Sequence, residues 1–222
     1  MRDRLVVLLA INSGATDAIG YLALGGAFSS VMTGNLVLGG LSIATGNRSL
    51  TLLTATALVS FVLGCAIGAR LAGRPRPGDG VWPTAVTRAL AVQTLICLGG
   101  SIGWWISGPD RTHSVKLLLL AVSAVGLGMQ SSTVQRFGDK GLSTTYLTGT
   151  LTGLVVTLAT GGRLRGVGRS ARLLLGLIAG AALGALLVTR APTFAPAAQL
   201  IPLVVTLAAA VINTARSEEE KS

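Results

Sequence analysis

MTGNLVLGGLSIATG, at residues 32–46, returns in altered form as LTGTLTGLVVTLATG at residues 147–161. The two copies lie 115 positions apart and end in the same Ala-Thr-Gly. The best-matched pairs are Thr33 with Thr148, Gly34 with Gly149, and Leu36 with Leu151. The sequence therefore predicts an internal duplication.

The similarity continues beyond the phrase, because FVLGCAIGA at residues 61–69 parallels LLLGLIAGA at residues 173–181. In each half a long apolar run is followed by a short run with Thr-Gly and then by two more long runs. We therefore divide the chain into a first membrane repeat at residues 1–107 and a second at residues 108–214. The polar end, residues 215–222, is predicted to be a disordered tail.

Composition indicates a membrane protein. Half of the residues are hydrophobic and only 12% are charged, a balance that does not suit a water-exposed surface. Apolar runs of about 20 residues, enough to cross roughly 30 Å of hydrocarbon, recur along the chain. The six clear runs are residues 5–24, 50–69, 89–106, 115–134, 173–188 and 197–212. We therefore predict an all-α protein with six transmembrane helices in a lipid bilayer.

The two weaker runs, residues 31–44 and 146–160, contain the repeated phrase and decide the topology. A helix of about 15 residues rises only about 22 Å, so these segments are expected to be re-entrant or half-spanning. With the N-terminus inside, six spans place 14 Lys and Arg residues inside and four outside, whereas eight crossings give 11 and seven. Six spans mean three crossings per half, which predicts two inverted repeats, as in many secondary transporters.

Several classes of function are disfavoured. The net charge of +10 does not predict nucleic-acid binding, because the basic residues lie between apolar runs and orient them in the membrane. Cys65 and Cys97 fall inside apolar runs, so neither a disulfide nor a metal site is expected. The single histidine, His113, lies in a predicted loop, and no phosphate-binding or metal-binding motif is present. We expect no enzymatic activity, no cofactor and no nucleic-acid partner.

Asp17 is the one acidic residue within a clear apolar run. An intramembrane carboxylate is costly and usually faces a cavity or a partner on the path of an ion, a proton or a substrate. Asn12 and Thr16 share a helical arc of about 140° with it. We predict a polar site here, with Asp17 coupling to a proton or cation. The alternative is that Asp17 is protonated, or lies near the outer interface, and only ties helices together.

The corresponding run of the second half carries a polar stripe at helical spacing, made of Ser123, Gly126, Gln130 and Thr133. Gln130 or Ser131 stands nearly where Asp17 stands in the first half. Two such stripes could face each other across the repeat axis and bind a ligand. The alternative is that the stripe serves only for hydrogen bonds between helices.

The Thr-Gly phrases are predicted to end near the midplane and to hold an ion or a small polar solute with backbone dipoles, hydroxyls and amides. The candidate residues are Thr33, Gly34 and Asn35 in the first copy and Thr145, Thr148, Gly149 and Thr150 in the second. The alternative is a packing notch for a neighbouring helix. The GxxxG pairs Gly64 with Gly68 and Gly176 with Gly180 predict close helix contacts.

Three stretches carry a family resemblance: TDAIGYLALGGAFSSVMTGN at residues 16–35, FVLGCAIGA at residues 61–69, and GMQSSTVQRFGDKGLSTTYLTGTLT at residues 128–152. They are similar to the YoaK family of uncharacterised bacterial inner-membrane proteins, and the resemblance covers most of the chain. It implies a six-span bacterial membrane protein with no established activity and no catalytic residues. Ser131 departs from the family, in which Asn often follows Gly-Met-Gln.

The leading functional hypothesis is a small secondary transporter or permease in the bacterial inner membrane, with both termini cytoplasmic and a polar site between the repeats. Its ligand would be a small polar solute or an ion. The alternative is a non-transporting membrane scaffold or assembly partner, in which the glycine and hydroxyl stripes serve helix association. A polar cavity favours the first hypothesis, and a dry, packed interior favours the second.

Overall fold

A computed structural model describes residues 2–75, 82–137, 147–160 and 167–219, and its regular structure there is helical. Six helices are long and apolar enough to cross a membrane, and two shorter ones complete the set. The long helices are α1 (Arg2–Ala23), α3 (Arg48–Ala72), α4 (Thr84–Ser107), α5 (His113–Gln135), α7 (Val167–Arg190) and α8 (Ala195–Glu219). The short ones are α2 (Met32–Ala44) and α6 (Leu147–Ala159); in addition a 3₁₀ turn, η2 (Pro192–Phe194), precedes α8. The prediction of an all-α membrane protein is confirmed.

The helix ends follow local sequence signals. The side chain of Asn47 accepts a hydrogen bond from the Leu50 amide and caps α3, and the Thr112 hydroxyl accepts one from the Val115 amide and caps α5. Gly73 and Gly108 end α3 and α4 with φ of 68° and 64°, a conformation that glycine adopts without strain. At the C-terminal end, α8 continues to Glu219 and so includes the start of the polar tail that the sequence delimits at residue 215.

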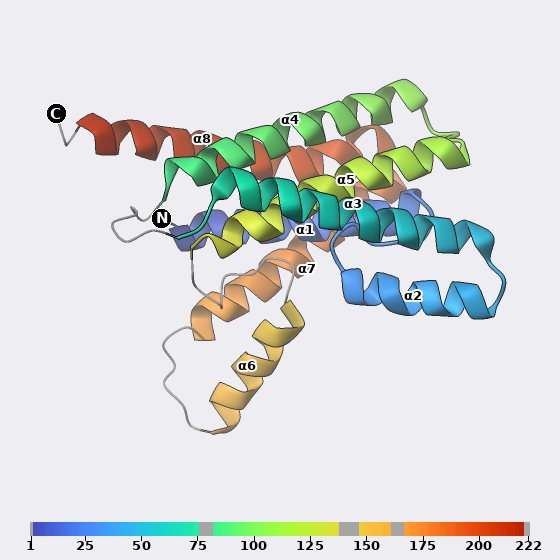
Figure 1. The fold of residues 1–222 in the computed structure, drawn as a ribbon, viewed down its shortest axis with the longest axis horizontal. Helices are drawn as coiled ribbons and strands as arrows, with labels where there is room; N and C mark the ends of the chain where they lie inside the picture. Colours follow the sequence, from blue (N-terminus) through green and yellow to red (C-terminus); the bar gives the residue numbers. More distant parts are fainter. Residues whose placement is uncertain (1, 76–81, 138–146, 161–166, 220–222) are drawn as a thin grey trace.

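The long helices alternate in direction along the chain (Figure 1). In that view α1, α4 and α7 run from left to right, whereas α3, α5 and α8 run from right to left. Each helix of the second half therefore runs opposite to its counterpart in the first, and both termini lie at the same end. We call this the terminal end and the other the distal end.

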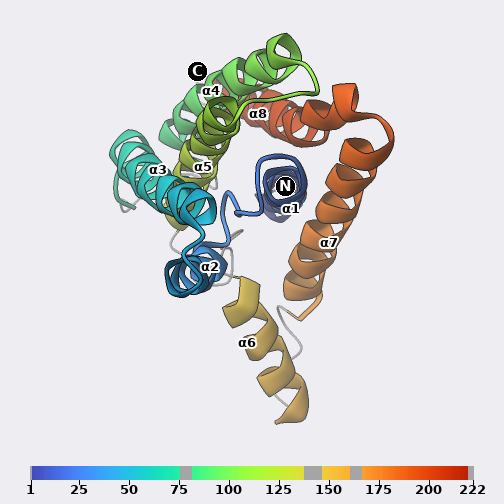
Figure 2. The same ribbon diagram turned by 90° about the vertical axis from the view of Figure 1, so that its right-hand side faces the viewer.

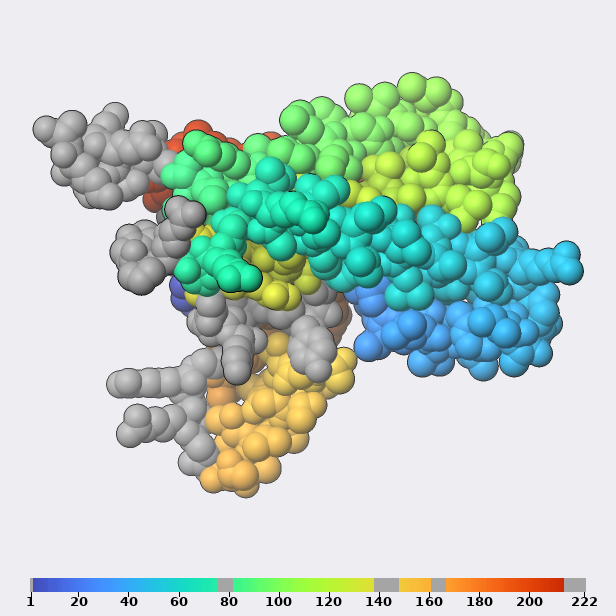
Figure 3. Space-filling view, in the orientation of Figure 1, coloured from blue at the N-terminus to red at the C-terminus, as the bar shows by residue number. Residues whose placement is uncertain are grey.

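The short helix α2 does not add a crossing. The chain leaves α1 at the distal end, turns back, and re-enters α2, which lies beside α3 and ends where α3 begins (Figure 1). Its 13 residues rise only about 20 Å, less than the thickness of the hydrocarbon layer. This segment is re-entrant, as its length predicts. The counterpart α6 packs on α7 and projects from the lower edge of the molecule, as the space-filling view shows (Figure 3).

The two halves are interlocked rather than side by side. Helix α1 packs most extensively against α7, and its counterpart α5 packs against α3, so that the first long helix of each half packs with the long helices of the other half. The result is two three-helix bundles, one of α1, α7 and α8 and one of α3, α4 and α5 (Figure 2). We call them bundle A and bundle B. They meet where α1 contacts α5 and α4 contacts α8.

Glycines hold each bundle together by close backbone approach, which confirms the predicted GxxxG contacts. A Cβ added at Gly180 would overlap the carbonyl oxygen of Ile11 in bundle A, and one at Gly64 would overlap that of Val125 in bundle B. The structure therefore matches Gly64 with Gly180, not with Gly176 as the sequence alignment suggests. The alignment is displaced by one helical turn because α7 has a third glycine at the same spacing, Gly184, which meets Ala15.

Two apolar clusters fill the interior, one nearer each end. Leu9 and Ala10 of α1 belong to the terminal cluster, and Ile19 belongs to the distal one. On α5, Val134 lies in the terminal cluster and Leu120 in the distal one. The residues of α1 and α5 between these positions include buried polar side chains. A polar layer therefore crosses the molecule at middle depth, where the two bundles meet.

Candidate functional site

The centre of the polar layer is a hydrogen bond between the two bundles. Asn12 of α1 donates from Nδ2 to Oε1 of Gln130 on α5 at 2.8 Å. The amide nitrogen of Gln130 in turn donates to the Leu9 carbonyl at 3.0 Å and to the Ser13 hydroxyl at 2.9 Å. Asn12, Ser13 and Gln130 are at most 1% exposed. One glutamine of bundle B is thus engaged by three residues of bundle A.

Two further glutamines extend this layer. Gln93 of α4 donates from Nε2 to Gln130 Oε1 at 3.1 Å, so that this oxygen accepts from both Asn12 and Gln93. On the other side, Thr16 lies 3.2 Å from Oε1 of Gln199 on α8, whose Nε2 lies 3.5 Å from the Ser101 hydroxyl of α4. We call the set the amide cluster; its members are Asn12, Ser13, Thr16, Gln93, Ser101, Gln130 and Gln199.

The amide cluster follows the internal symmetry. Gln130 of α5 corresponds to Thr16 of α1 at the same offset that relates Val125 to Ile11 in the glycine contacts. Gln93 of α4 bonds to Gln130, and Gln199 of α8 bonds to Thr16. The third long helix of each half, α4 or α8, therefore supplies one glutamine to the first helix of the other half, α5 or α1. The cluster lies on the pseudo-twofold axis between the bundles.

Sequence reasoning found Asn12, Thr16 and Gln130 but missed Gln93 and Gln199. The sequence does contain a pattern that could have identified them, because each is the one amide side chain inside a clear apolar run, at residues 89–106 and 197–212. A polar side chain at membrane depth is unusual whether or not it is charged. Only the tertiary structure shows that Gln93 and Gln199 contact the polar stripes of α5 and α1, the first helices of the two halves.

Asp17 does not belong to the amide cluster. Its Oδ1 accepts hydrogen bonds from the backbone amides of Ser29 and Ser30 at 2.8 and 2.7 Å, and its Oδ2 accepts one from the Ser30 hydroxyl at 2.6 Å. The carboxylate is 6% exposed. It holds the turn between α1 and α2, and no cation is bonded to it among the contacts of the described residues.

Asn35 fastens the same turn from the other side. Its Oδ1 accepts from the Phe28 amide at 2.9 Å and its Nδ2 donates to the Phe28 carbonyl at 2.7 Å, as a paired backbone strand would. Asp17 and Asn35 thus form one clamp on residues 28–30. We call it the hairpin clamp. Next to it in α2, Gly34 is half-buried against Phe28, and Thr33 is exposed.

The second copy of the phrase lies elsewhere. Thr148 and Gly149 are exposed on α6, and Thr150 is half-buried. The structure does not bring them to the amide cluster, because α6 lies at the edge of the molecule (Figures 2 and 3). Thr145 lies outside the described residues. Ser131, which corresponds to Asp17 at the offset of α1 and α5, is buried next to Gln130.

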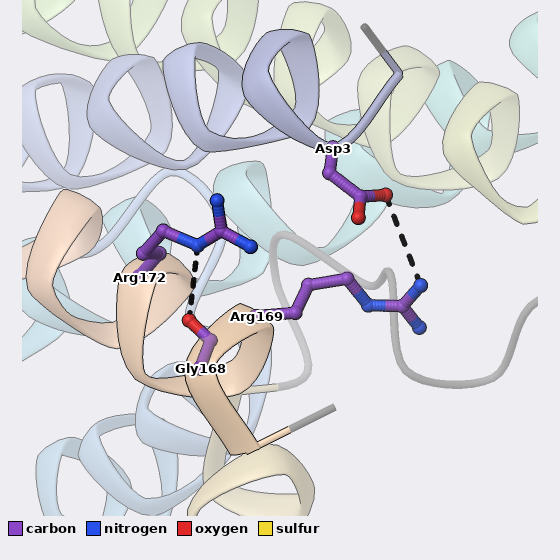
Figure 4. Close-up of polar contacts among 4 residues, drawn as sticks. All are labelled: Asp3, Gly168, Arg169 and Arg172. Atoms are coloured by element: carbon purple, nitrogen blue, oxygen red, sulfur yellow. Dashed lines mark hydrogen bonds and ion pairs between the residues drawn. The ribbon is translucent and has the colours of Figure 1, made fainter. Parts of the chain in front are cut away.

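Charged side chains gather at the terminal end rather than in the cluster. Figure 4 shows Arg169 of α7 beside Asp3 of α1, with 3.8 Å between Nη1 and Oδ1, and Arg172 donating from Nε to the Gly168 carbonyl. The pair is partly exposed, so it contributes about 1 kcal/mol or less. Within the described ranges, no three His, Cys, Asp or Glu side chains come together as a metal site would require.

The distal end is closed by two tryptophans. Trp104 of α4 donates from its indole nitrogen to the Pro192 carbonyl at 3.0 Å, and Trp105 donates to the Thr193 carbonyl at 2.8 Å. Because Pro192 and Thr193 precede α8, these bonds join bundle B to bundle A. Arg111 stacks on the Trp104 ring at 3.6 Å, and burial lowers the pKa of its guanidinium. We call this contact the tryptophan latch.

Comparison with known proteins gives a family but no activity. The profile described as "Protein of unknown function (DUF1275)" matches residues 5–212. "UPF0700 transmembrane protein YoaK" of Bacillus subtilis (strain 168) is 34% identical over 154 residues, which is 69% of this chain. The aligned part is 66% of that relative, slightly less than two-thirds of its length. No solved structure matches the chain.

Proposed function

This chain belongs to the DUF1275 family of transmembrane proteins of unknown function, and from that premise we propose that it is a small secondary transporter or permease. The solute site in this proposal is the amide cluster. The observation that carries it is the hydrogen bond between Asn12 and Gln130, which joins two bundles at middle depth on a pseudo-twofold axis. Inverted repeats that place polar groups at such a position are the plan of many secondary transporters.

The cost of the polar layer supports a functional role. Amides and hydroxyls taken from water into an apolar interior lose free energy unless they are hydrogen-bonded. Hydrogen bonds between membrane helices return only about 0.6 kcal/mol on average. Because these bonds return so little, three buried glutamines between the bundles favour a binding site over a role in helix association alone.

The helix packing also allows the two bundles to move relative to each other. Within bundle A and within bundle B, glycine contacts bring the helix backbones together, so each bundle can behave as a rigid body. Between the bundles, α1 touches α5 less extensively than either touches its partner in its own bundle. We propose that the bundles rock about this seam and open the amide cluster to one side at a time.

In this proposal Asp17 is the coupling residue through the hairpin clamp. All three bonds to its carboxylate come from donors, so each needs an oxygen lone pair. A proton on Oδ2 would require the Ser30 hydroxyl to change from donor to acceptor, and it would weaken the two bonds from backbone amides to Oδ1, because a neutral carbonyl oxygen accepts less strongly than a carboxylate. Protonation would therefore loosen residues 28–30 and the start of α2, which links a proton to the position of a re-entrant segment.

The proposed location is the bacterial inner membrane, with both termini in the cytoplasm. The termini lie at one end of the molecule, where Arg2, Arg4, Arg169 and Arg172 also lie at the helix starts. Positive charge collects on the cytoplasmic side of bacterial membrane proteins. The distal end, which the tryptophan latch closes, would then face outward.

The test is side-specific labelling of a single cysteine at Ser13, in protein with Cys65 and Cys97 replaced. A membrane-impermeant thiol reagent is applied to right-side-out and inside-out vesicles. We expect Ser13→Cys to react from at least one side, whereas Leu120→Cys, buried in the distal apolar cluster, stays unreactive from both. If Ser13→Cys is as inert as the control on both sides, the amide cluster is dry and the scaffold hypothesis replaces this one.

A further inference from the structure

The two symmetry-related glutamines differ in how well they are bonded. Gln199 is engaged at both ends of its amide, since Oε1 faces Thr16 and Nε2 faces Ser101. Within the described part of the chain, Gln93 is engaged only through Nε2, which donates to Gln130. Its Oε1 is buried and has no hydrogen-bond partner among the described residues. Since Gln93 is 0% exposed, this oxygen is an unused acceptor deep in the protein.

A second unused group lies close by on α5. Thr133 follows Gln130 by three residues, so it is on the same helical face and about one turn nearer the terminal end. Its hydroxyl is buried and has no hydrogen-bond partner among the described residues, although a threonine in a helix often bonds to its own backbone. Gln93 and Thr133 are therefore both neighbours of Gln130, the first through a hydrogen bond from α4 and the second by helical spacing on α5.

The remaining chemistry of the cluster is uncharged. Its seven members carry amides and hydroxyls, and the nearby carboxylate of Asp17 is occupied by Ser29 and Ser30. A cationic solute would lose its hydration here without meeting an opposite charge, which is far more costly than the transfer of a neutral molecule. The nearest buried ionic group along α5, Arg136, follows Thr133 by three residues and would repel a cation. An anion without N–H or O–H groups would bring no donor to Gln93 Oε1. A neutral molecule with N–H or O–H groups would satisfy the acceptor on Gln93 without that cost.

We propose that the solute is a small uncharged molecule of the amide or polyol type, which donates an N–H or O–H to Gln93 Oε1 and bonds to the Thr133 hydroxyl. This inference rests on the proposed transport function and specifies its substrate class. Gln199 keeps its partners in this arrangement and serves to orient Thr16. Gln93 and Thr133 are the residues that select the solute.

The experiment compares two solutes of nearly the same shape, neutral urea and cationic guanidinium, together with glycerol as a polyol. The protein is reconstituted into liposomes, and uptake of each radiolabelled compound is measured against protein-free liposomes. We expect the protein to raise uptake of urea, glycerol or both, and to leave guanidinium uptake at the protein-free level.

Two pairs of variants assign the uptake to the site. Gln93→Leu and the isosteric Thr133→Val are each expected to lower it about tenfold, as the loss of one hydrogen bond would. The matched controls are Gln135→Leu, at an exposed position of α5, and Thr94→Val, whose hydroxyl bonds to its own helix. Both controls are expected to keep the wild-type rate. Because Thr133→Val hardly changes the volume of the side chain, it still tests the proposed solute site if Gln93→Leu does not fold.

Three outcomes would overturn the inference. Uptake of guanidinium without urea or glycerol would show a charged substrate and leave the transport proposal standing. Neutral uptake that is unchanged in both Gln93→Leu and Thr133→Val would place the solute elsewhere. Absence of uptake for all three solutes would exclude this substrate class, and the labelling of Ser13→Cys would then decide separately whether the cluster opens at all.

Discussion

Gln130 and Asn12 join the two bundles across the middle of the protein, with 2.8 Å between the oxygen of one amide and the nitrogen of the other. They come from the first helices of the two halves. The same Gln130 oxygen accepts from Gln93, and the same Gln130 nitrogen reaches Leu9 and Ser13. This one side chain therefore links the amide cluster together, and its removal is the most direct test of what the cluster does for stability.

Gln130→Leu should destabilise the protein by about 1 to 3 kcal/mol, because the donors of Asn12 and Gln93 lose their shared acceptor in a buried place. The measurement is reversible unfolding in mixed micelles, followed by a helix signal. Gln135→Leu, exposed on the same helix, is the control and should change the unfolding free energy by less than about 0.5 kcal/mol. Equal stability of the two variants would mean that the cluster bonds contribute nothing to holding the bundles together.

Gly180→Ala should lower stability by about 2 kcal/mol or more, since the new methyl group would overlap the Ile11 carbonyl and force α1 away from α7. Gly64→Ala should do the same between α3 and α5, where it meets Val125. Thermal unfolding in detergent measures both. Gly40→Ala is the control, because nothing lies within 4 Å of the added Cβ, and a helical alanine there should be neutral or stabilising. Tolerance of both core substitutions would contradict the close packing.

Asp17→Ala should free the turn between α1 and α2, because three hydrogen bonds to residues 29 and 30 disappear together. Hydrogen exchange read by mass spectrometry should show faster exchange of a peptide that covers residues 24–35, by about tenfold or more. Asp17→Asn should exchange more slowly than Asp17→Ala, since its amide oxygen can still accept from the backbone. It should also remove any dependence of solute uptake on a proton gradient.

Asp3→Asn provides the control for the Asp17 variants. Asp3 is also an acidic residue of α1, but its carboxylate is partly exposed and forms an ion pair with Arg169 at 3.8 Å, far from the turn in sequence. Its removal should leave exchange of residues 24–35 unchanged. If Asp17→Ala exchanges like the wild type, the carboxylate does not hold the turn, and its proposed role in coupling loses its structural basis.

Ser49→Cys and Gly168→Cys should be labelled from opposite sides of the membrane. Both positions are exposed and stand at the starts of α3 and α7, which correspond to each other in the two halves. An impermeant reagent on sealed vesicles of known orientation separates the sides. Asp110→Cys, between α4 and α5, should label from the same side as Ser49→Cys. Labelling of Ser49→Cys and Gly168→Cys from one side would refute the inverted arrangement.

Trp104→Phe should make Ser13→Cys more reactive from the distal side, because the indole bond to the Pro192 carbonyl is lost while the ring remains. The expected gain is severalfold, in line with the loss of one hydrogen bond. Trp82→Phe is the control: its indole bonds to Thr87 within the start of α4, at the terminal end. A gain of the same size in both variants would mean a general loosening rather than an opened latch.

The sequence was sufficient for the list of helices. The six spans and the two short segments follow from apolar length, and the duplication follows from the phrase at residues 32–46 and 147–161. Inversion follows from the odd number of crossings per half and from the distribution of Arg and Lys. These properties depend on the free energy of transferring each segment from water to lipid, and that free energy is set by the residues of the segment itself.

The sequence was less informative about the candidate site. It singled out Asn12, Thr16, Asp17 and Gln130 as one group, whereas the structure separates Asp17 into the hairpin clamp. It gave both copies of the phrase the same role, but Asn35 is buried in the clamp and Thr148 is exposed at the edge. The clamp depends on two acceptors, Asp17 and Asn35. Their counterparts in the second half are Ser131 and Thr150, which carry neither a carboxylate nor an amide.

The amino-acid sequence by itself determined that this is a duplicated, six-span helical membrane protein, because hydrophobic length and charge act locally on each segment. Only the tertiary structure decided that the halves interlock into bundles A and B and that Gln93 and Gln199 join the cluster on the axis. The reason is that helix partners in a bilayer are chosen by surface fit. The fit of Gly180 to Ile11 and of Gly64 to Val125 joins helices from different halves, and no pattern within one helix specifies that pairing.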